Sequence, residues 1–100
     1  MDFKMTIYGP AEYPEVEIGG NTYFVEDEIE STERLVIDSI NKTVRKYDAL
    51  GNWVSDFHLR DRDNYIFQKI PTGISSIARN GSFDVDLIAY EYRSEPEWWT

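Results

Sequence analysis

Apolar and polar side chains alternate along most of this chain, which is the pattern of β-strands with one buried face. The first such segment, residues 3–9, places Phe3, Met5 and Ile7 on one face and ends at a Gly-Pro pair, which predicts a strand followed by a turn. Helical apolar spacing never persists through about ten residues without a turn signal. The periodicity therefore predicts an all-β protein with no helix of ordinary length.

A first hairpin is predicted in residues 14–26, which read PEVEIGGNTYFVE. Gly19 and Gly20 can supply both positive φ angles of a type I′ turn. That turn would place Val16 opposite Tyr23 on the buried face.

A second hairpin is predicted in residues 35–46, which read LVIDSINKTVRK. A four-residue loop over residues 39–42 would place Ile37 opposite Val44. Asp38 would then lie at the start of the loop, where its carboxylate can accept backbone N–H groups. We interpret Asp38 as a turn-forming residue and not as a catalyst.

The chain then turns near residues 48–52 and returns as WVSDF, residues 53–57, so a meander of three strands is expected. Residues 59–65 are charged and lack apolar periodicity, which predicts a surface loop. The next segment, YIFQKI, residues 65–70, is predicted to be a strand, and the Pro-x-Gly sequence that begins at residue 71 is predicted to turn before ISSIAR.

The Asn80-Gly81 pair is the strongest short hairpin signal in the chain. A two-residue turn would place Ala78 opposite Phe83, whereas a three-residue bulged turn would place Ile77 opposite Phe83. The residues do not decide between these two registers.

The last long run, residues 82–93, alternates apolar and polar positions but changes phase after Leu87. This change predicts either a bulge or a strand covered on both faces. Eight or nine short strands with closely spaced turns predict an antiparallel β-sandwich, because such sheets cover their apolar faces with each other. With no repeat or linker, residues 1–100 are expected to form a single β-sandwich domain.

Charge is unevenly distributed along the chain, whose net charge is −9. Residues 1–33 carry one Lys and nine Asp or Glu (−8), residues 34–79 eight basic and five acidic residues (+3), and residues 80–100 one Arg and five acidic residues (−4). Phosphate backbones would be repelled by most of this surface, so no nucleic-acid partner is expected. The apolar runs are far shorter than the ~20 residues of a membrane-spanning helix, and neither membrane insertion nor a secretory leader is expected.

Candidate chemistry is sparse. His58 is the single histidine and has no nucleophile motif near it, and the absence of cysteine excludes thiolate sites. Residues 61–64, DRDN, have the oxygen-rich look of a calcium loop but lack its glycine and its closing glutamate, so a charged turn is favoured. We therefore expect no enzyme activity, no catalytic residue, no cofactor and no metal.

Exposed aromatic residues are the remaining indication of function. Trp53, Tyr65, Trp98 and Trp99 are expected at strand ends or near the last residue, where protein interfaces and sugar-stacking platforms are built. Core filling explains Trp53 equally well.

Three segments, in this order, carry a resemblance to a known family: IYGPAEYPEVEIGGNTYFV, LVIDSINKTVRKYDALGN and IPTGISSIARNGSFDVDLIAYEYRSEPEW. They contain a G-P…P-x-V-x-I entry, an L-x-I-D…K-T-V hairpin, a P-x-G…I turn and a closing V-x-L…Y-x-x-R strand. Together they resemble the C-terminal lobe of the distal tail protein of siphophages and related prophage elements, across essentially the whole chain.

The resemblance implies a galectin-like, jelly-roll-like sandwich and a structural role in the virion, at the phage tail tip or baseplate. The family's ring-forming domain has no counterpart here, so a monomer is expected, made in the bacterial host cytoplasm and assembled with other tail proteins. Ile40 replaces a residue that is usually polar in the family and is a contact candidate. Trp98 and Trp99 are expected either to dock onto a neighbouring protein or to anchor the chain end. The alternative function is recognition of a host cell-wall saccharide, with Trp53 or Tyr65 stacked on a pyranose ring. A small glycosidase ranks third.

Overall fold

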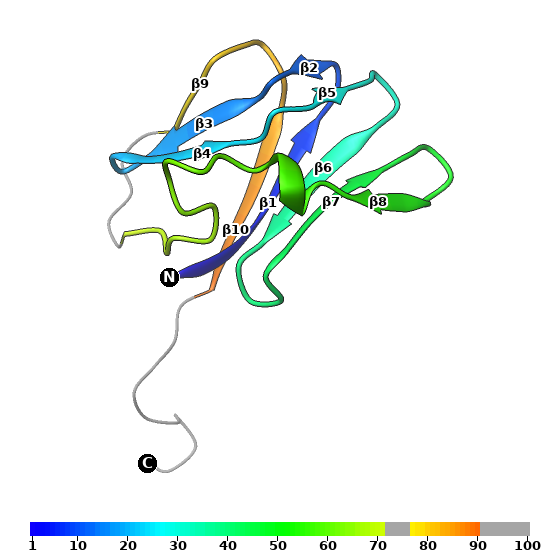
Figure 1. Cartoon of the computed structure of the whole chain (residues 1–100). Coiled ribbons are helices and arrows are strands. Elements are labelled where there is room, and N and C mark those ends of the chain that lie inside the picture. Colours follow the sequence, from blue (N-terminus) through cyan, green and yellow to red (C-terminus); the bar gives the residue numbers. More distant parts are fainter. Residues whose placement is uncertain (72–76, 91–100) are drawn as a thin grey trace, which may run out of the picture.

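A computed structural model of the chain describes residues 1–71 and 77–90 and shows an all-β protein (Figure 1). The elements are β1 (Asp2–Tyr8), β2 (Ala11–Glu12), β3 (Glu15–Ile18), β4 (Asn21–Phe24), β5 (Glu28–Ile29), β6 (Arg34–Asp38), β7 (Thr43–Tyr47), β8 (Trp53–Ser55), a 3₁₀ turn η1 (Phe57–Leu59), β9 (Ile77–Arg79) and β10 (Val85–Tyr90). The predicted all-β class is confirmed. None of the described residues belongs to a helix that is long and apolar enough to cross a membrane.

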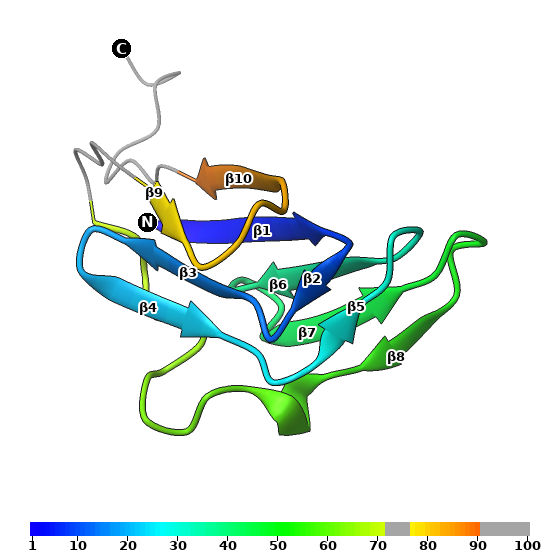
Figure 2. The ribbon, with the colours of Figure 1, turned by 90° about the horizontal axis from the view of Figure 1, so that it is seen from above.

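The strands form three antiparallel sheets, with the orders β10-β1-β6-β7-β8, β2-β5 and β4-β3-β9. The short β2-β5 pair continues the ribbon of β3 and β4, as Figures 1 and 2 show. The meander predicted from residues 35–57 is confirmed as β6, β7 and β8.

One apolar core joins the five-stranded and three-stranded sheets. Phe3, Met5 and Ile7 of β1 are buried, as their period of two predicts. The Phe3 ring meets the Tyr23 ring of β4 edge-on, with 5.2 Å between the ring centroids. Because this contact links the two sheets, Phe3 lies at a central position of the core.

The first predicted hairpin forms with the predicted register. Gly19 and Gly20 have φ angles of 55° and 85°, and Val16 of β3 lies opposite Tyr23 of β4. Both paired side chains are buried. Two glycines are needed here because other residues rarely adopt two consecutive positive φ angles.

The second predicted hairpin is confirmed as well, with Ile37 of β6 opposite Val44 of β7. The Asp38 Oδ1 atom accepts the backbone N–H groups of Ile40 at 3.0 Å and Asn41 at 3.1 Å. These bonds hold the loop in a fixed shape, as the interpretation of Asp38 as a turn-forming residue requires.

The strand predicted over residues 65–70 does not exist. Ile66 and Phe67 are adjacent and both buried, which a strand with one buried face does not allow, because it would turn them to opposite faces. The segment instead packs against the core without pairing with a strand. The Tyr23 hydroxyl donates to its Gln68 carbonyl at 2.7 Å, and its Ile70 N–H donates to the Met1 carbonyl at 2.8 Å. Tertiary hydrogen bonds therefore replace sheet pairing.

The hairpin predicted at Asn80-Gly81 is wrong in both of its possible registers. β9 pairs with β3 and β10 pairs with β1, so the chain crosses from one sheet to the other at this point. The Asn80 side chain accepts the Glu15 N–H at 3.0 Å and donates to the Tyr13 carbonyl at 3.1 Å. Gly81 is not among the glycines with positive φ, so the turn that the pair predicts is not formed.

The phase change in the last run causes neither a bulge nor a doubly covered strand in the described part of β10. Pairing with β1 is continuous from Val85 opposite Ile7 to Tyr90 opposite Asp2. Ile88 is 53% exposed, so the face that carries it is open to solvent. The end of this run, residues 91–93, and most of the turn predicted at residues 71–73 lie outside the described residues.

Candidate functional site

Three aromatic rings form a cluster: that of Phe57 in η1, and those of Tyr65 and Phe67 in the segment that follows η1. The Phe57 and Phe67 rings are stacked with centroids 5.9 Å apart and planes inclined by 11°, and the Tyr65 ring meets Phe67 edge-on at 5.8 Å. Phe67 is buried, whereas Phe57 is 39% and Tyr65 61% exposed. The buried Phe67 ring therefore supports the rings of Phe57 and Tyr65, which both face solvent.

Two cations lie against these rings. The Arg60 guanidinium carbon is 3.8 Å from the centroid of Phe57, and Arg60 Nη1 donates to the Phe57 carbonyl at 2.8 Å. The Lys42 ammonium is 5.6 Å from the centroid of Phe67. Both distances lie within the range of cation–π attraction. We call Lys42, Phe57, Arg60, Tyr65 and Phe67 the Tyr65 surface.

The Tyr65 surface contains one of the contact candidates, Tyr65 itself. Lys42 belongs to the loop between β6 and β7, and the same loop carries Ile40, whose side chain is 46% exposed. Sequence reasoning identified Tyr65 and Ile40 separately. It missed Phe57 and Phe67, because two phenylalanines separated by ten positions show no common periodicity.

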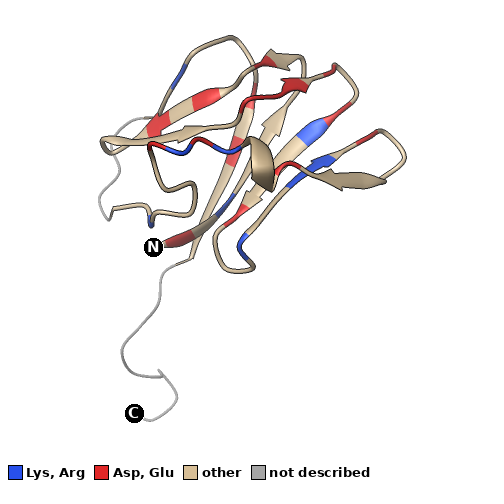
Figure 3. Cartoon of the chain, in the orientation of Figure 1, with Lys and Arg blue, Asp and Glu red and all other residues tan. Residues whose placement is uncertain are grey.

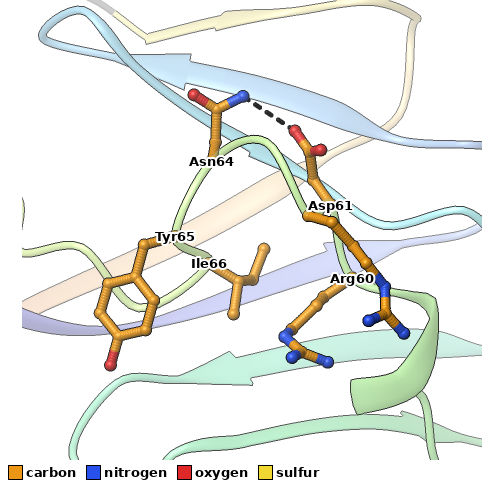
Figure 4. A pocket seen from close by; sticks show the side chains of 6 residues that line it. Arg60, Asp61, Asn64, Tyr65 and Ile66 are labelled. Carbon is orange, nitrogen blue, oxygen red and sulfur yellow. Dashed lines mark hydrogen bonds between the residues drawn. The ribbon is translucent and has the colours of Figure 1, made fainter.

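A pocket of about 390 Å³ adjoins this surface (Figure 4). Its lining residues are Arg60, Asp61, Arg62, Asn64, Tyr65 and Ile66. Asn64 donates to Asp61 Oδ2 at 2.8 Å, and the Asp63 N–H donates to Asp61 Oδ1 at 2.9 Å. These hydrogen bonds, that from Asn64 first, lower the pKa of Asp61.

Residues 61–64 thus form the expected charged turn, because both oxygens of Asp61 accept hydrogen bonds from within it. Across residues 1–71 and 77–90, no group of three or more histidine or acidic side chains is arranged to hold a metal ion. The turn and the preceding Arg60 together place hydrogen-bonding groups and two guanidinium groups around an open pocket.

Trp53 lies on a different part of the molecule. Its side chain on β8 is 49% exposed, so it does not fill the core, and the Arg45 guanidinium carbon lies 4.0 Å from its ring centroid. The pocket lining does not include Trp53. Trp98 and Trp99 lie outside the described residues.

A partly buried acidic cluster around Asp56 is the feature that no sequence pattern predicts. Asp56, between β8 and η1, is 3% exposed, and Asp27 Oδ2 lies 3.0 Å from the ammonium of Lys46. Burial first, then the neighbouring Asp27, raises the pKa of Asp56 to about 7. Burial alone would raise the pKa of Asp27, but hydrogen bonds with Asp56 and Lys46 lower it.

Comparison of the chain with protein-family models, with curated proteins and with solved structures found no match. The expectation of a phage-tail role therefore has no support beyond the resemblance of the sequence motifs.

Proposed function

We propose that this chain is a non-enzymatic binding module of a bacteriophage or prophage tail tip, and that it contacts a neighbouring tail or baseplate protein through the Tyr65 surface. The proposal includes a galectin-like sandwich for the three sheets and a place in the virion. The tail context comes from the motif resemblance. The observation that carries the binding role is the pair of solvent-facing rings held by buried Phe67.

The Tyr65 surface has the properties of an interface centre. Aromatic and arginine side chains dominate the binding energy of protein interfaces. Stacking between Phe57 and Phe67 and the bond from Arg60 to the Phe57 carbonyl order the site before a partner arrives, which reduces the entropy lost on binding.

Charge indicates the kind of partner. Figure 3 shows acidic residues along β3 and β5, whereas the loop that follows η1 carries basic residues alternating with acidic ones. Arg60 and Arg62 line the pocket together with one acidic side chain, Asp61, so two cations face one anion there. The surface is therefore suited to a partner that supplies carboxylates or carbonyl oxygens.

Replacing Tyr65 by alanine is expected to weaken partner binding by about tenfold or more, because an exposed ring at an interface centre contributes on the order of 1–2 kcal/mol. Thermal stability should change little, since the side chain is 61% exposed. Calorimetric titration against the tail proteins encoded beside this chain measures the loss. Tyr13→Ala is the matched control, because Tyr13 is an exposed tyrosine outside the pocket lining. Equal losses in both variants, or no binding to any of those proteins, would refute the proposal.

The pocket also favours the second candidate function, recognition of a saccharide. An exposed tyrosine ring beside an amide and two guanidinium groups combines a stacking surface with hydrogen-bonding groups, as sugar sites do. Tyr65→Ala should then abolish the binding of host cell-wall polysaccharide that a titration measures. A flat titration of the unmodified chain would exclude this function.

A further inference from the structure

Asp56 is held in a buried position by its own backbone. Its N–H donates to the Val44 carbonyl of β7 at 2.8 Å, and its carbonyl accepts the Leu59 N–H of η1 at 2.9 Å. Just beyond, the Glu26 N–H donates to the Leu59 carbonyl at 2.9 Å, and the Asp61 N–H donates to the Phe24 carbonyl at 3.0 Å. The segment that contains η1 is thus fastened to β7 on one side and to the end of β4 on the other.

Charged groups from three other segments face the Asp56 carboxyl. They are Asp27 from the connection between β4 and β5, Lys46 from β7, and Glu33 from the connection between β5 and β6. The ammonium of Lys46 is 3.0 Å from Asp27 Oδ2 and 3.4 Å from the Glu28 carbonyl. Lys46 is therefore the single cation in this group of four, and it is already paired with Asp27, one of the three acidic residues.

The Asp56 Oδ2 atom is buried, and no group among the described residues donates a hydrogen bond to it. An ionised carboxylate without a donor is costly at such a position. A protonated Asp56 removes the problem, because its O–H can donate to the Asp27 carboxylate. Asp56 with a proton, Asp27 and Lys46 then sum to zero charge.

We propose that Asp56, Asp27 and Lys46 form a proton-dependent latch that fastens the segment from β8 through η1 to the corner between β4 and β5. Because η1 contains Phe57, release of the latch would disturb the Tyr65 surface. This last link, regulation of binding, depends on the proposed function. The latch itself does not.

The direction of the pH dependence follows from the two acids. The pKa of Asp56 is raised to about 7 in the folded chain, so the stabilisation is complete below the ordinary value of 3.8 and is lost as pH rises through 7. The pKa of Asp27 is lowered, so its contribution is present above 3.8 and is lost as pH falls through the folded value. The latch is therefore strongest near pH 4 and weakens progressively as the pH rises to about 7.

The Asp56→Asn variant tests the latch, because the asparagine amide can donate to Asp27 at every pH. We expect the Tm of the unmodified chain to fall by about 5 °C or more between roughly pH 6 and pH 8.5, and that of the variant to change far less. Asp63→Asn, which removes the same charge at an exposed position, should retain the full dependence of the unmodified chain. A decline in Asp56→Asn as steep as in Asp63→Asn would overturn the proposal.

Carbon-13 NMR of the Asp56 carboxyl in the unmodified chain keeps the proposal testable if Asp56→Asn does not fold. A titration midpoint near pH 7 is expected, and a midpoint below about pH 5 would refute the latch. The Phe57 ring signals should shift with the same midpoint, and unchanged Phe57 signals would disprove the link to binding. Failure of the Tyr65→Ala prediction would instead refute the proposed function and leave the carboxyl titration unaffected.

Discussion

Replacing Phe3 by alanine is expected to lower the free energy of unfolding by roughly 3–5 kcal/mol. Phe3 is fully buried in β1, and its ring lies edge-on to Tyr23 of β4, with 5.2 Å between the centroids. The substitution removes the contact between the two sheets and leaves a cavity that rigid strands cannot fill. A domain of this size has only about 5–15 kcal/mol of net stability, so the substitution should remove a large share of it.

Urea denaturation measures this loss. Ile88→Ala is the control, because Ile88 lies on the adjacent strand β10 and is 53% exposed. Its cost should be below about 1 kcal/mol. Equal costs at the two positions would contradict a core shared by β1 and β4.

Replacing Gly9 by alanine is expected to cost about 3 kcal/mol or more, because the new Cβ would collide with backbone atoms. An ideal Cβ at Gly9 would overlap the Glu30 carbonyl oxygen and lie 2.5 Å from the Glu30 carbonyl carbon and 2.8 Å from the Ile29 oxygen. The Gly9 N–H also donates to the Glu33 carbonyl at 3.0 Å, so the chain cannot move away without losing this bond.

Gly51→Ala separates collision from backbone strain. Gly51 has a φ of 88°, yet a Cβ there meets no atom within 4 Å. Only the positive φ penalises alanine at this position, at a cost of about 1–2 kcal/mol. Thermal unfolding of both variants gives the comparison, and a Gly9→Ala variant no less stable than Gly51→Ala would contradict the close approach at Gly9.

The parts of the fold that the sequence predicts are those specified by neighbouring residues. Gly19 and Gly20 select a turn and a register by their φ angles alone, and Asp38 shapes its loop through bonds to the next residues. The hairpin prediction at Asn80 fails because the Asn80 side chain forms hydrogen bonds with the backbone of Tyr13 and Glu15, more than sixty positions away. No local pattern contains that information.

The same distinction applies to the site. Tyr65 could be selected as an aromatic residue at a predicted strand end, and Ile40 because the resemblance implies a polar residue at its position. The acidic cluster around Asp56 could not be selected, since Asp27 and Asp56 each resemble any other acid in a strongly acidic chain. Only the pairing of β7 with β8 and the connection after β4 bring them beside Lys46.

We propose that this chain binds a tail protein through the Tyr65 surface. Two-dimensional NMR of the isotope-labelled chain, titrated with each tail-tip protein encoded beside it, tests this most directly. The predicted result is a set of shifted signals concentrated at residues 40–42, 57–60 and 65–67. Shifts concentrated instead on β3 and β4, or around Trp53 on β8, would contradict the account.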